Sequence, residues 1–350
     1  MKTLANNTLS PYDNPDQFNK PIEIPIDEAD EYFDALKSMK KIRMVEEIIS
    51  DNVKSGVIKC PCHLSNGQEA IPVSVSKYIK KTDYIFGNHR SHGHYLACGG
   101  SAYELFAEVL GKVTGCAKGM GGSMHLCSPE NGFMGSVPIV AGTISLAVGA
   151  ALASKNNQAG AVAVSYFGDG ATEEGAFHES LNFAAKFELP ILFVCENNLF
   201  SSHLHILERQ PKTATSRFAI ANDIKVFIED GNDLVALSKI LTTIIPEIRK
   251  NNQPMFLEAV TYRHKGHVGH DENIDVGLHR STDLEKWKKR DPIKRTLKGL
   301  SKLNPIYLER YHNFKKILNK DLIDSWKRAM ADPFPNQKQL LNTVYYNDNN

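Results

Sequence analysis

The sequence predicts an α/β fold with a mainly parallel sheet flanked by helices. Two apolar stretches of strand length, residues 161–167 and 191–195, enclose a segment of helical pattern at 173–187. A strand, a helix and a strand in this order form a parallel pair with a right-handed crossover. The same alternation returns with a strand at 224–228, a helix at 233–249 and a strand at 255–260. Repeated alternation of this kind is typical of α/β domains.

Other segments indicate what surrounds this core. Residues 31–49 carry apolar side chains at about every third position with charges between them, which predicts an amphipathic helix packed on the core. Residues 102–110 predict another helix, whereas the five glycines of residues 111–122 are too many for regular structure and predict a loop. The small apolar residues of 141–153 suit a helix pressed closely against a neighbouring surface.

The two ends of the chain differ from the part between them. Residues 1–30 are polar and rich in Pro and Asn, without the apolar segment of a secretory signal. They predict an arm that lies on the surface or on another subunit. Residues 31–333 carry all the predicted elements and form one domain, and residues 334–350 form a polar tail. We find no apolar stretch of the ~18 residues that a membrane span needs.

Composition excludes several classes of protein. The 41 Lys and Arg residues balance 40 Asp and Glu residues, so charge alone recruits neither nucleic acid nor a membrane surface. Six cysteines without a C-x-x-C pair predict reduced thiols in a cytoplasmic protein. Cys60 and Cys62 are the only close pair, and we interpret them as two loop or core thiols in preference to a metal or redox site.

A short glycine-rich sequence, Gly168-Asp169-Gly170-Ala171, follows one predicted strand and opens the next helix. Open α/β sheets bind their ligands at this end of the strands. The two glycines allow backbone N–H groups to approach an anion, and the helix adds the positive end of its dipole. Because Gly-Asp-Gly occurs in many turns, this sequence alone is a weak indication of a site.

Asn197 and Asn198 strengthen the interpretation because they follow the next predicted strand, with Asn198 29 residues after Asp169. Neighbouring parallel strands lie about 5 Å apart, so Asp169 and Asn198 can share one ion. A carboxylate, an amide oxygen, a backbone carbonyl, two phosphate oxygens and a water complete the octahedral oxygen shell that Mg²⁺ requires. The two sequences together predict a diphosphate and magnesium site.

Several motifs, in order along residues 32–292, resemble one family. The segment from Gly168-Asp169-Gly170 to Asn197-Asn198 resembles the thiamine diphosphate signature. The sequence Phe177-His178-Glu179-Ser180-Leu181-Asn182 resembles the α subunits of two-component 2-oxo acid dehydrogenases and acetoin dehydrogenases. Further matches are Gly67-Gln68-Glu69-Ala70, His89-Arg90-Ser91-His92-Gly93-His94, Gly121-Gly122-Ser123-Met124-His125 and Thr261-Tyr262-Arg263. The resemblance implies a thiamine diphosphate-binding fold.

The resemblance also implies roles for individual residues. Asp169, the Asn198 side chain and the Phe200 carbonyl would hold Mg²⁺, and Arg90 would contact the diphosphate. The backbone at Ile139 and Val140 would contact the aminopyrimidine. His267 would face both the cofactor phosphates and the substrate, and His125 is the second expected catalytic histidine. The complete set implied at the cofactor is His89, Arg90, Ile139, Val140, Gly168, Asp169, Gly170, Ala171, Asn198 and His267.

The histidines allow a rival interpretation as zinc ligands. Two sets come into question, namely His89, His92 and His94, and His264, His267 and His270. Neither set contains the i, i+4 pair of a helical site, and Arg90 lies inside the first. We therefore favour anion binding and proton transfer for those histidines that lie near the cofactor.

Departures from the family pattern affect the expected substrate more than the cofactor. His89 stands where many members have Tyr, although acetoin-type chains share this His. Pro138 and Ala141 replace glycines that often flank the Ile-Val pair. Val268 stands where kinase-regulated mitochondrial members have Ser, so we expect no phosphorylation switch at this position.

The resemblance implies an oxidoreductase, the α subunit of a two-component E1 enzyme. It would use thiamine diphosphate, which supplies the electron sink, to decarboxylate a small 2-oxo acid such as pyruvate oxidatively. A lipoyl-bearing acyltransferase would receive the acyl group. A chain of 350 residues provides one such domain, and the family's activating Glu lies on another, so we expect a β subunit in an α₂β₂ complex. The alternatives are acetoin cleavage, thiamine-dependent carbohydrate modification and a non-catalytic regulatory subunit.

Overall fold

The computed structural model describes residues 10–339 and confirms the predicted α/β fold. Six parallel strands form one sheet in the order β2-β1-β3-β4-β8-β7. The strands are β1 (Tyr84–Gly87), β2 (Phe133–Ser136), β3 (Ala163–Gly168), β4 (Ile191–Asn197), β7 (Lys225–Asp230) and β8 (Met255–Val260). A small antiparallel hairpin of β5 (Phe200–Ser201) and β6 (Leu204–His205) follows β4.

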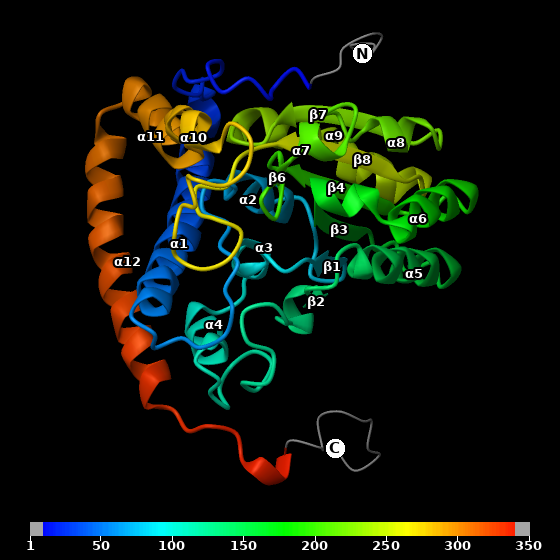
Figure 1. Cartoon of the computed structure of the whole chain (residues 1–350). Coiled ribbons are helices and arrows are strands. Elements are labelled where there is room, and N and C mark those ends of the chain that lie inside the picture. The colour runs from blue at the N-terminus through cyan, green and yellow to red at the C-terminus, as the bar shows by residue number, and fades with distance from the viewer. Residues whose placement is uncertain (1–9, 340–350) are drawn as a thin grey trace.

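Helices cover both faces of this sheet because its central strands are apolar on both sides. Successive side chains of β3 alternate between two clusters, with Ala163 in one and Val164 in the other. The first cluster includes α5 (Gly142–Asn156) and α6 (Gly175–Lys186), and the second includes α2 (Ala70–Ser76) and α9 (Leu234–Asn251). In Figure 1, α5 and α6 project to the right of the sheet.

A further layer of helices covers the side opposite to α5 and α6 (Figure 1). The long α1 (Ala29–Lys54) packs on the core through its apolar stripe and contacts two helices of the C-terminal part, α11 and α12. The remaining helices are α3 (His92–Ala97), α4 (Ala102–Val109), α7 (Ile206–Arg209), α8 (Arg217–Ile220), α10 (Arg280–Lys289), α11 (Pro292–Leu303) and α12 (Ile306–Ala331).

The predicted glycine loop contains no long helix or strand, and one buried carboxylate organises it. Both oxygens of Glu108 accept hydrogen bonds from the loop backbone. The donors are the N–H groups of Ala117, Gly119, Gly121 and Gly122, at 2.7–3.0 Å. A buried carboxylate thereby replaces the backbone ladder that a helix or strand would provide.

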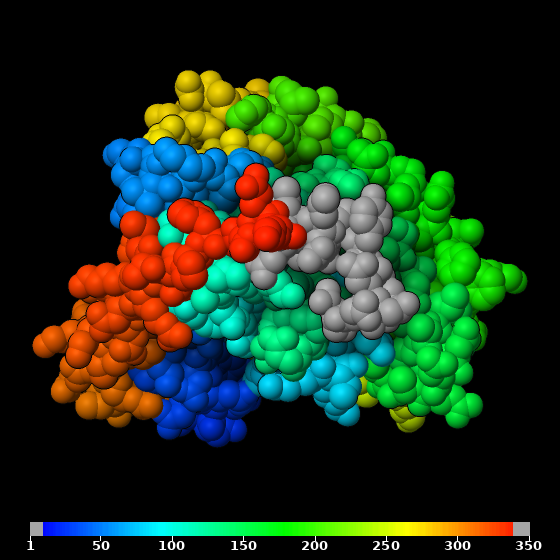
Figure 2. Space-filling view, turned by 90° about the horizontal axis from the view of Figure 1, so that it is seen from below, coloured from blue at the N-terminus to red at the C-terminus, as the bar shows by residue number. Residues whose placement is uncertain are grey.

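Both described ends of the chain are attached to the domain. Arg290 donates hydrogen bonds to the carbonyls of Tyr12 and Asn14, which hold the described part of the predicted arm. At the other end the Lys112 ammonium donates to the Asp332 carbonyl at 2.8 Å, and Figure 2 shows this end lying along the lower face. Residues 1–9 of the predicted arm and 340–350 of the predicted tail lie outside the described residues. Within residues 10–339, no helix is long and apolar enough to cross a membrane.

Candidate active site

A cleft of about 830 Å³, including its open mouth, lies at the carboxyl ends of the central strands. Its walls come from the segments that follow β1, β3 and β4, from residues 139–143 and from His267. The strand order reverses between β1 and β3, which is where open α/β sheets bind ligands. Of the predicted site residues, those that line the cleft are His89, Arg90, Ile139, Val140, Gly168, Asp169, Gly170, Ala171, Asn198, Phe200 and His267.

His125 is the predicted residue that does not line this cleft. Its side chain is exposed, and its Nδ1 atom lies 3.1 Å from the Gly121 carbonyl in the glycine loop. Ser123 belongs to the same motif as His125. Unlike His125 it is buried, and it lies against His92. The structure therefore separates this histidine from the other predicted site residues.

Asp169 is a buried carboxylate at the centre of the cleft, with only 1% of its surface exposed. Its Oδ2 atom pairs with the Arg209 guanidinium, which also pairs with Glu173. Its Oδ1 atom has no partner among the described residues. Burial raises the pKa of Asp169, although the Arg209 charge opposes that change. An oxygen without a partner on a buried carboxylate fits a site for a cation.

The Asn198 amide lies beside this carboxylate at the end of the neighbouring strand. Its Nδ2 atom donates to Gln68 Oε1 at 3.0 Å, and its Oδ1 atom accepts from the Phe200 N–H at 3.2 Å. Leu199 between them adopts a left-handed φ of 68°, a conformation that non-glycine residues rarely hold outside functional turns. This turn directs the chain into the β5–β6 hairpin and brings Phe200 to the cleft.

Gly170 is required for the hairpin to approach the Asp169 turn. A Cβ atom at this position would lie 2.3 Å from Ser201 Oγ and 2.7 Å from Ser201 Cβ, so any side chain would push the hairpin away. At Gly168, in contrast, an added Cβ would meet no atom within 4 Å. The backbone at Gly168 thus faces open space, as a ligand held by backbone N–H groups requires.

Arg90 in the lining of the cleft and Arg263 next to the lining residue Ser202 form a cationic wall. Arg90 is held by the carbonyls of Leu64, at 2.6 Å, and of His267, at 3.2 Å. Arg263 donates to the Ser202 carbonyl, while its Nε and Nη1 atoms have no partner among the described residues. Burial, with a smaller contribution from the charge of Arg280, lowers the pKa of Arg90 to about 10. Burial and the charges of Arg90 and Arg280 lower the pKa of Arg263 to about 8. Two buried guanidinium groups, of which Arg263 has N–H donors without a partner among the described residues, fit a multiply charged anion such as a diphosphate.

Three histidine rings cluster beside the two arginines, and two of them, His89 and His267, line the cleft. The His63 ring lies 4.8 Å from the ring of His89 and 4.8 Å from the ring of His267, edge to face in both pairs. Burial, reinforced by the charge of Arg90, lowers the pKa values of His63, His89 and His267 to about 3, 2 and 4. All three rings are therefore neutral at pH 7.

The zinc interpretation of the histidines finds no support in this geometry. His89 reaches the cleft, whereas His92 lies against Glu46 and Ser123, and His94 stacks on Tyr166 and contacts Glu196. Among residues 10–339, no three His, Cys, Asp or Glu side chains are grouped to hold a metal ion. The candidate site at Asp169 and Asn198 contains only one residue of these four types, Asp169.

Sequence reasoning missed three residues that the cleft region contains, namely His63, Gln68 and Arg263. Gln68 and Arg263 belong to motifs that the sequence analysis singled out, but neither position indicates which wall it joins. His63 follows Cys62 with no pattern of its own. Its signal is tertiary, since only folding brings it against His89 and His267.

The histidine wall predicts a pH dependence of stability. Each of these pKa values is lower in the fold than the ~6.5 of an unfolded chain, so acidification protonates the unfolded state first. Stability is therefore complete above pH about 6.5 and falls below it, by at most about 1.4 kcal/mol per histidine at pH 5.5. Denaturant titrations at pH 7.5 and 5.5 measure this loss. His63→Asn should reduce it, and the same change at the exposed His312 should not; equal losses in all three proteins would contradict the explanation.

Known proteins match this chain over most of its length. The family model described as "Dehydrogenase E1 component" matches residues 37–338. The α subunit of the pyruvate dehydrogenase E1 component of Rhizobium meliloti is 32% identical, over 89% of this chain and 88% of that protein. The α subunit of the acetoin:2,6-dichlorophenolindophenol oxidoreductase of Bacillus subtilis is 32% identical, over 88% and 92%. A mitochondrial pyruvate dehydrogenase E1 α subunit of Arabidopsis thaliana is 31% identical, over 91% and 80%.

Proposed function

Because the chain belongs to the dehydrogenase E1 component family, we propose that it is the α subunit of a two-component enzyme. The enzyme uses thiamine diphosphate and Mg²⁺ to decarboxylate a small 2-oxo acid oxidatively, and a lipoyl-bearing acyltransferase receives the acyl group. One observation carries the proposal: a buried carboxylate with an oxygen that has no partner among the described residues, an amide and a guanidinium group meet in one cleft where the strand order reverses.

The residues of the cleft fit the two parts of this cofactor. We assign Mg²⁺ to Asp169, the Asn198 side chain and the Phe200 carbonyl, which are hard oxygen donors suited to this ion. Arg90 and His267 bind the diphosphate together with the backbone of Gly168, Gly170 and Ala171, all of which line the cleft. A bound anion stabilises the cationic wall, including Arg263, because the charges of Arg90 and Arg280 oppose that of Arg263.

The remaining assignments concern the ring and the substrate. The backbone at Ile139 and Val140 contacts the aminopyrimidine, and His89 lies beside Arg90 at the same ligand. His267 faces the substrate as well as the phosphates, and because its pKa is lowered to about 4 its ring is neutral at pH 7 and has a nitrogen that can accept a proton. When bound, thiamine diphosphate supplies the electron sink for cleavage beside the carbonyl carbon. His125 takes part only through a partner that covers the glycine loop.

The cleft offers few acidic side chains, and this shortage supports a β subunit that supplies another. The carboxylate residues of the cleft are Asp169 and Glu196, and Glu196 lies 3.1 Å from His94 Nε2. Neither is left to contact the aminopyrimidine, a role that we assign to a glutamate of the partner. Ile139, at the rim of the cleft, is 71% exposed. This apolar rim favours a second subunit that closes the cleft.

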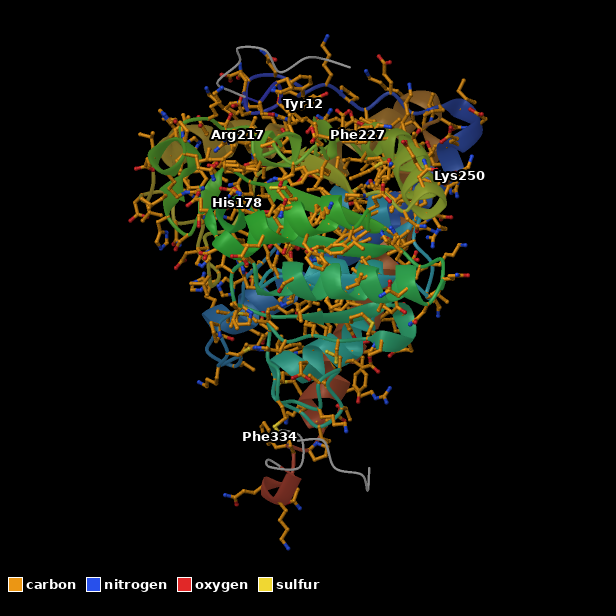
Figure 3. The ribbon with its side chains drawn as sticks, turned by 90° about the vertical axis from the view of Figure 1, so that its right-hand side faces the viewer. Tyr12, His178, Arg217, Phe227, Lys250 and Phe334 are labelled. Atoms are coloured by element: carbon orange, nitrogen blue, oxygen red, sulfur yellow. The ribbon has the colours of Figure 1, made fainter. Side chains whose placement is uncertain are left out.

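The outer face of α5 and α6 continues this apolar surface. Leu146 on α5, Phe183 on α6 and Phe187 directly after α6 are exposed, and Gly149 leaves room for a neighbouring chain to approach the α5 backbone. Figure 3 looks onto this side, with His178 of α6 labelled. We propose that the β subunit packs here in an α₂β₂ complex. The free thiols support a cytoplasmic protein.

Pyruvate is the first substrate that we expect, with acetoin close behind and branched-chain 2-oxo acids third. Hydrophobic pockets separate substrates that differ by one methylene only about 10–200-fold. The test is kcat/KM for pyruvate, acetoin and branched 2-oxo acids, measured with a redox dye on the chain purified together with its β subunit. Preference for the branched acids would overturn the ranking, and turnover of a keto-sugar alone would instead indicate carbohydrate modification. No turnover with bound cofactor would favour a regulatory subunit.

A further inference from the structure

Two free thiols lie side by side in the segment that leads into His63, one of the three clustered histidines. The Sγ atoms of Cys60 and Cys62 are 3.9 Å apart, at hydrogen-bonding distance for sulfur. Cys62 is fully buried, whereas Cys60 is partly exposed. A disulfide needs the sulfurs at about 2.05 Å, so an approach of roughly 1.9 Å separates this pair from a covalent bond.

The two thiols differ in a way that suits successive reactions. The hydrogen bond from Cys62 lowers the pKa of Cys60 to about 7, and the same bond and burial raise the pKa of Cys62. Cys60 therefore supplies a thiolate at a partly exposed position, and Cys62 supplies a thiol that is fully buried. A thiolate, and not a thiol, is the species that attacks a disulfide.

We propose that Cys60 and Cys62 form a reversible oxidation site, which low-molecular-weight disulfides convert into an intramolecular disulfide. The Cys60 thiolate attacks one sulfur of the small disulfide, forming a mixed disulfide and releasing one thiolate. The Cys62 sulfur then attacks Cys60 Sγ and displaces the second small thiolate, which takes up the Cys62 proton. The dithiol loses two electrons, and the small disulfide is reduced to two thiols.

The backbone around the pair connects this site to the cleft. The Cys62 carbonyl accepts a hydrogen bond at 2.9 Å from the Gly269 N–H, in the loop that carries His267. The Leu64 carbonyl holds the Arg90 guanidinium at 2.6 Å, and His63 between them packs on His89 and His267. Drawing the sulfurs together within three residues shifts this segment, so oxidation displaces His63 and Arg90. A disulfide strained by so short a loop is also readily reduced.

Peptide mapping tests the site without reference to any activity. Trypsin cleaves after Lys59 and Lys77, and the peptide 60–77 contains Cys60 and Cys62, while each of the other four cysteines falls in a separate peptide. After exposure of the full chain to oxidised glutathione and alkylation, we expect this peptide to lose two hydrogens and to carry no alkyl group. Dithiothreitol should restore it. Two alkyl groups, or a lasting glutathione adduct, would overturn the proposal.

Variants separate the two steps. Cys62→Ala should stop the reaction at the mixed disulfide and leave glutathione on Cys60. Cys60→Ser changes the partly exposed position and should leave Cys62 unmodified, which keeps the test valid if the core does not tolerate the first change. Cys98→Ser is the matched control, because burial raises the pKa of the Cys98 thiol to about 12; it should oxidise like the unchanged chain. An adduct on Cys62 in Cys60→Ser would contradict the assigned order.

The effect on the cleft rests on the proposed function and is measured separately, on the complex with the β subunit. Displacement of positioning groups by about 1 Å costs roughly 10²-fold in rate, so we expect oxidation to lower turnover by about 10²-fold. Dithiothreitol should restore the rate, and Cys60→Ser should be active and insensitive to oxidised glutathione. Disulfide formation with an unchanged rate would overturn the link to the cleft. No turnover even by the reduced complex would refute the proposed function, while the peptide result would still decide the oxidation site.

Discussion

Replacing Asp169 by asparagine should abolish magnesium-dependent activity in the complex with the β subunit. Asp169 is the charged protein ligand that we assign to the ion, and its Oδ1 atom has no partner among the described residues. Loss of charge stabilisation by a metal is worth roughly 4 kcal/mol, or about 10³-fold in rate. The measurement is kcat/KM at saturating Mg²⁺, together with the magnesium concentration for half-maximal activity.

The fold should survive this change, because burial already opposes the charged form of Asp169 and a neutral amide removes that cost. Glu173→Gln is the matched control, since Glu173 is the other carboxylate that pairs with Arg209. If activity depended on releasing or holding Arg209, both variants would lose it. Full activity in Asp169→Asn, or an equal loss in Glu173→Gln, would contradict the metal assignment.

Introducing a charge on the outer face of α5 should separate the two subunits. Leu146 is 56% exposed in the chain alone, and in the proposed complex Leu146→Glu would bury a carboxylate without a partner. We expect a cost of about 2 kcal/mol or more, equivalent to a roughly 30-fold weaker Kd. Analytical ultracentrifugation of the mixed subunits measures the complex, and the dye assay should show activity falling with it.

The matched control places the same charge far from this face. Ile317 on α12 is 63% exposed, so Ile317→Glu changes an equally exposed apolar side chain. It should leave both assembly and activity intact, and neither variant should alter the unfolding of the isolated chain. The chain without its β subunit should show no turnover. Full turnover by the single chain, or normal assembly of Leu146→Glu, would refute the proposed interface.

The sequence predicted those parts of the fold that carry a strong local pattern. The strands β3 and β4 are apolar at nearly every position and therefore appear as buried strands without any tertiary information. The same holds for α1, whose apolar stripe marks its buried face. The four-residue strands β1 and β2 were missed because so short a segment carries too little periodicity. Their pairing depends on the rest of the sheet, which no local pattern describes.

Some residues of the candidate site could likewise be predicted from the sequence, and others could not. The sequence predicted that Asp169 and Asn198 are close, because parallel strands place their carboxyl ends at one edge of the sheet. The positions of His63 and Arg263 could not be predicted, since each reaches the cleft region from a loop whose path is set by tertiary contacts. His125 lies outside the lining of the cleft although its motif suggested a site residue, because membership of a motif does not fix the direction of a side chain. The ion pair of Asp169 with Arg209 was also unforeseen.

The cleft should hold thiamine diphosphate through a magnesium ion at Asp169 and Asn198. An equilibrium titration of the α and β complex with thiamine diphosphate, followed by calorimetry with Mg²⁺ and again with a chelator, measures this binding. We predict saturable binding of one cofactor per α subunit with Mg²⁺, and its loss both with the chelator and in Asp169→Asn. Absence of binding with Mg²⁺, or binding unchanged by the chelator and by Asp169→Asn, would contradict the claim.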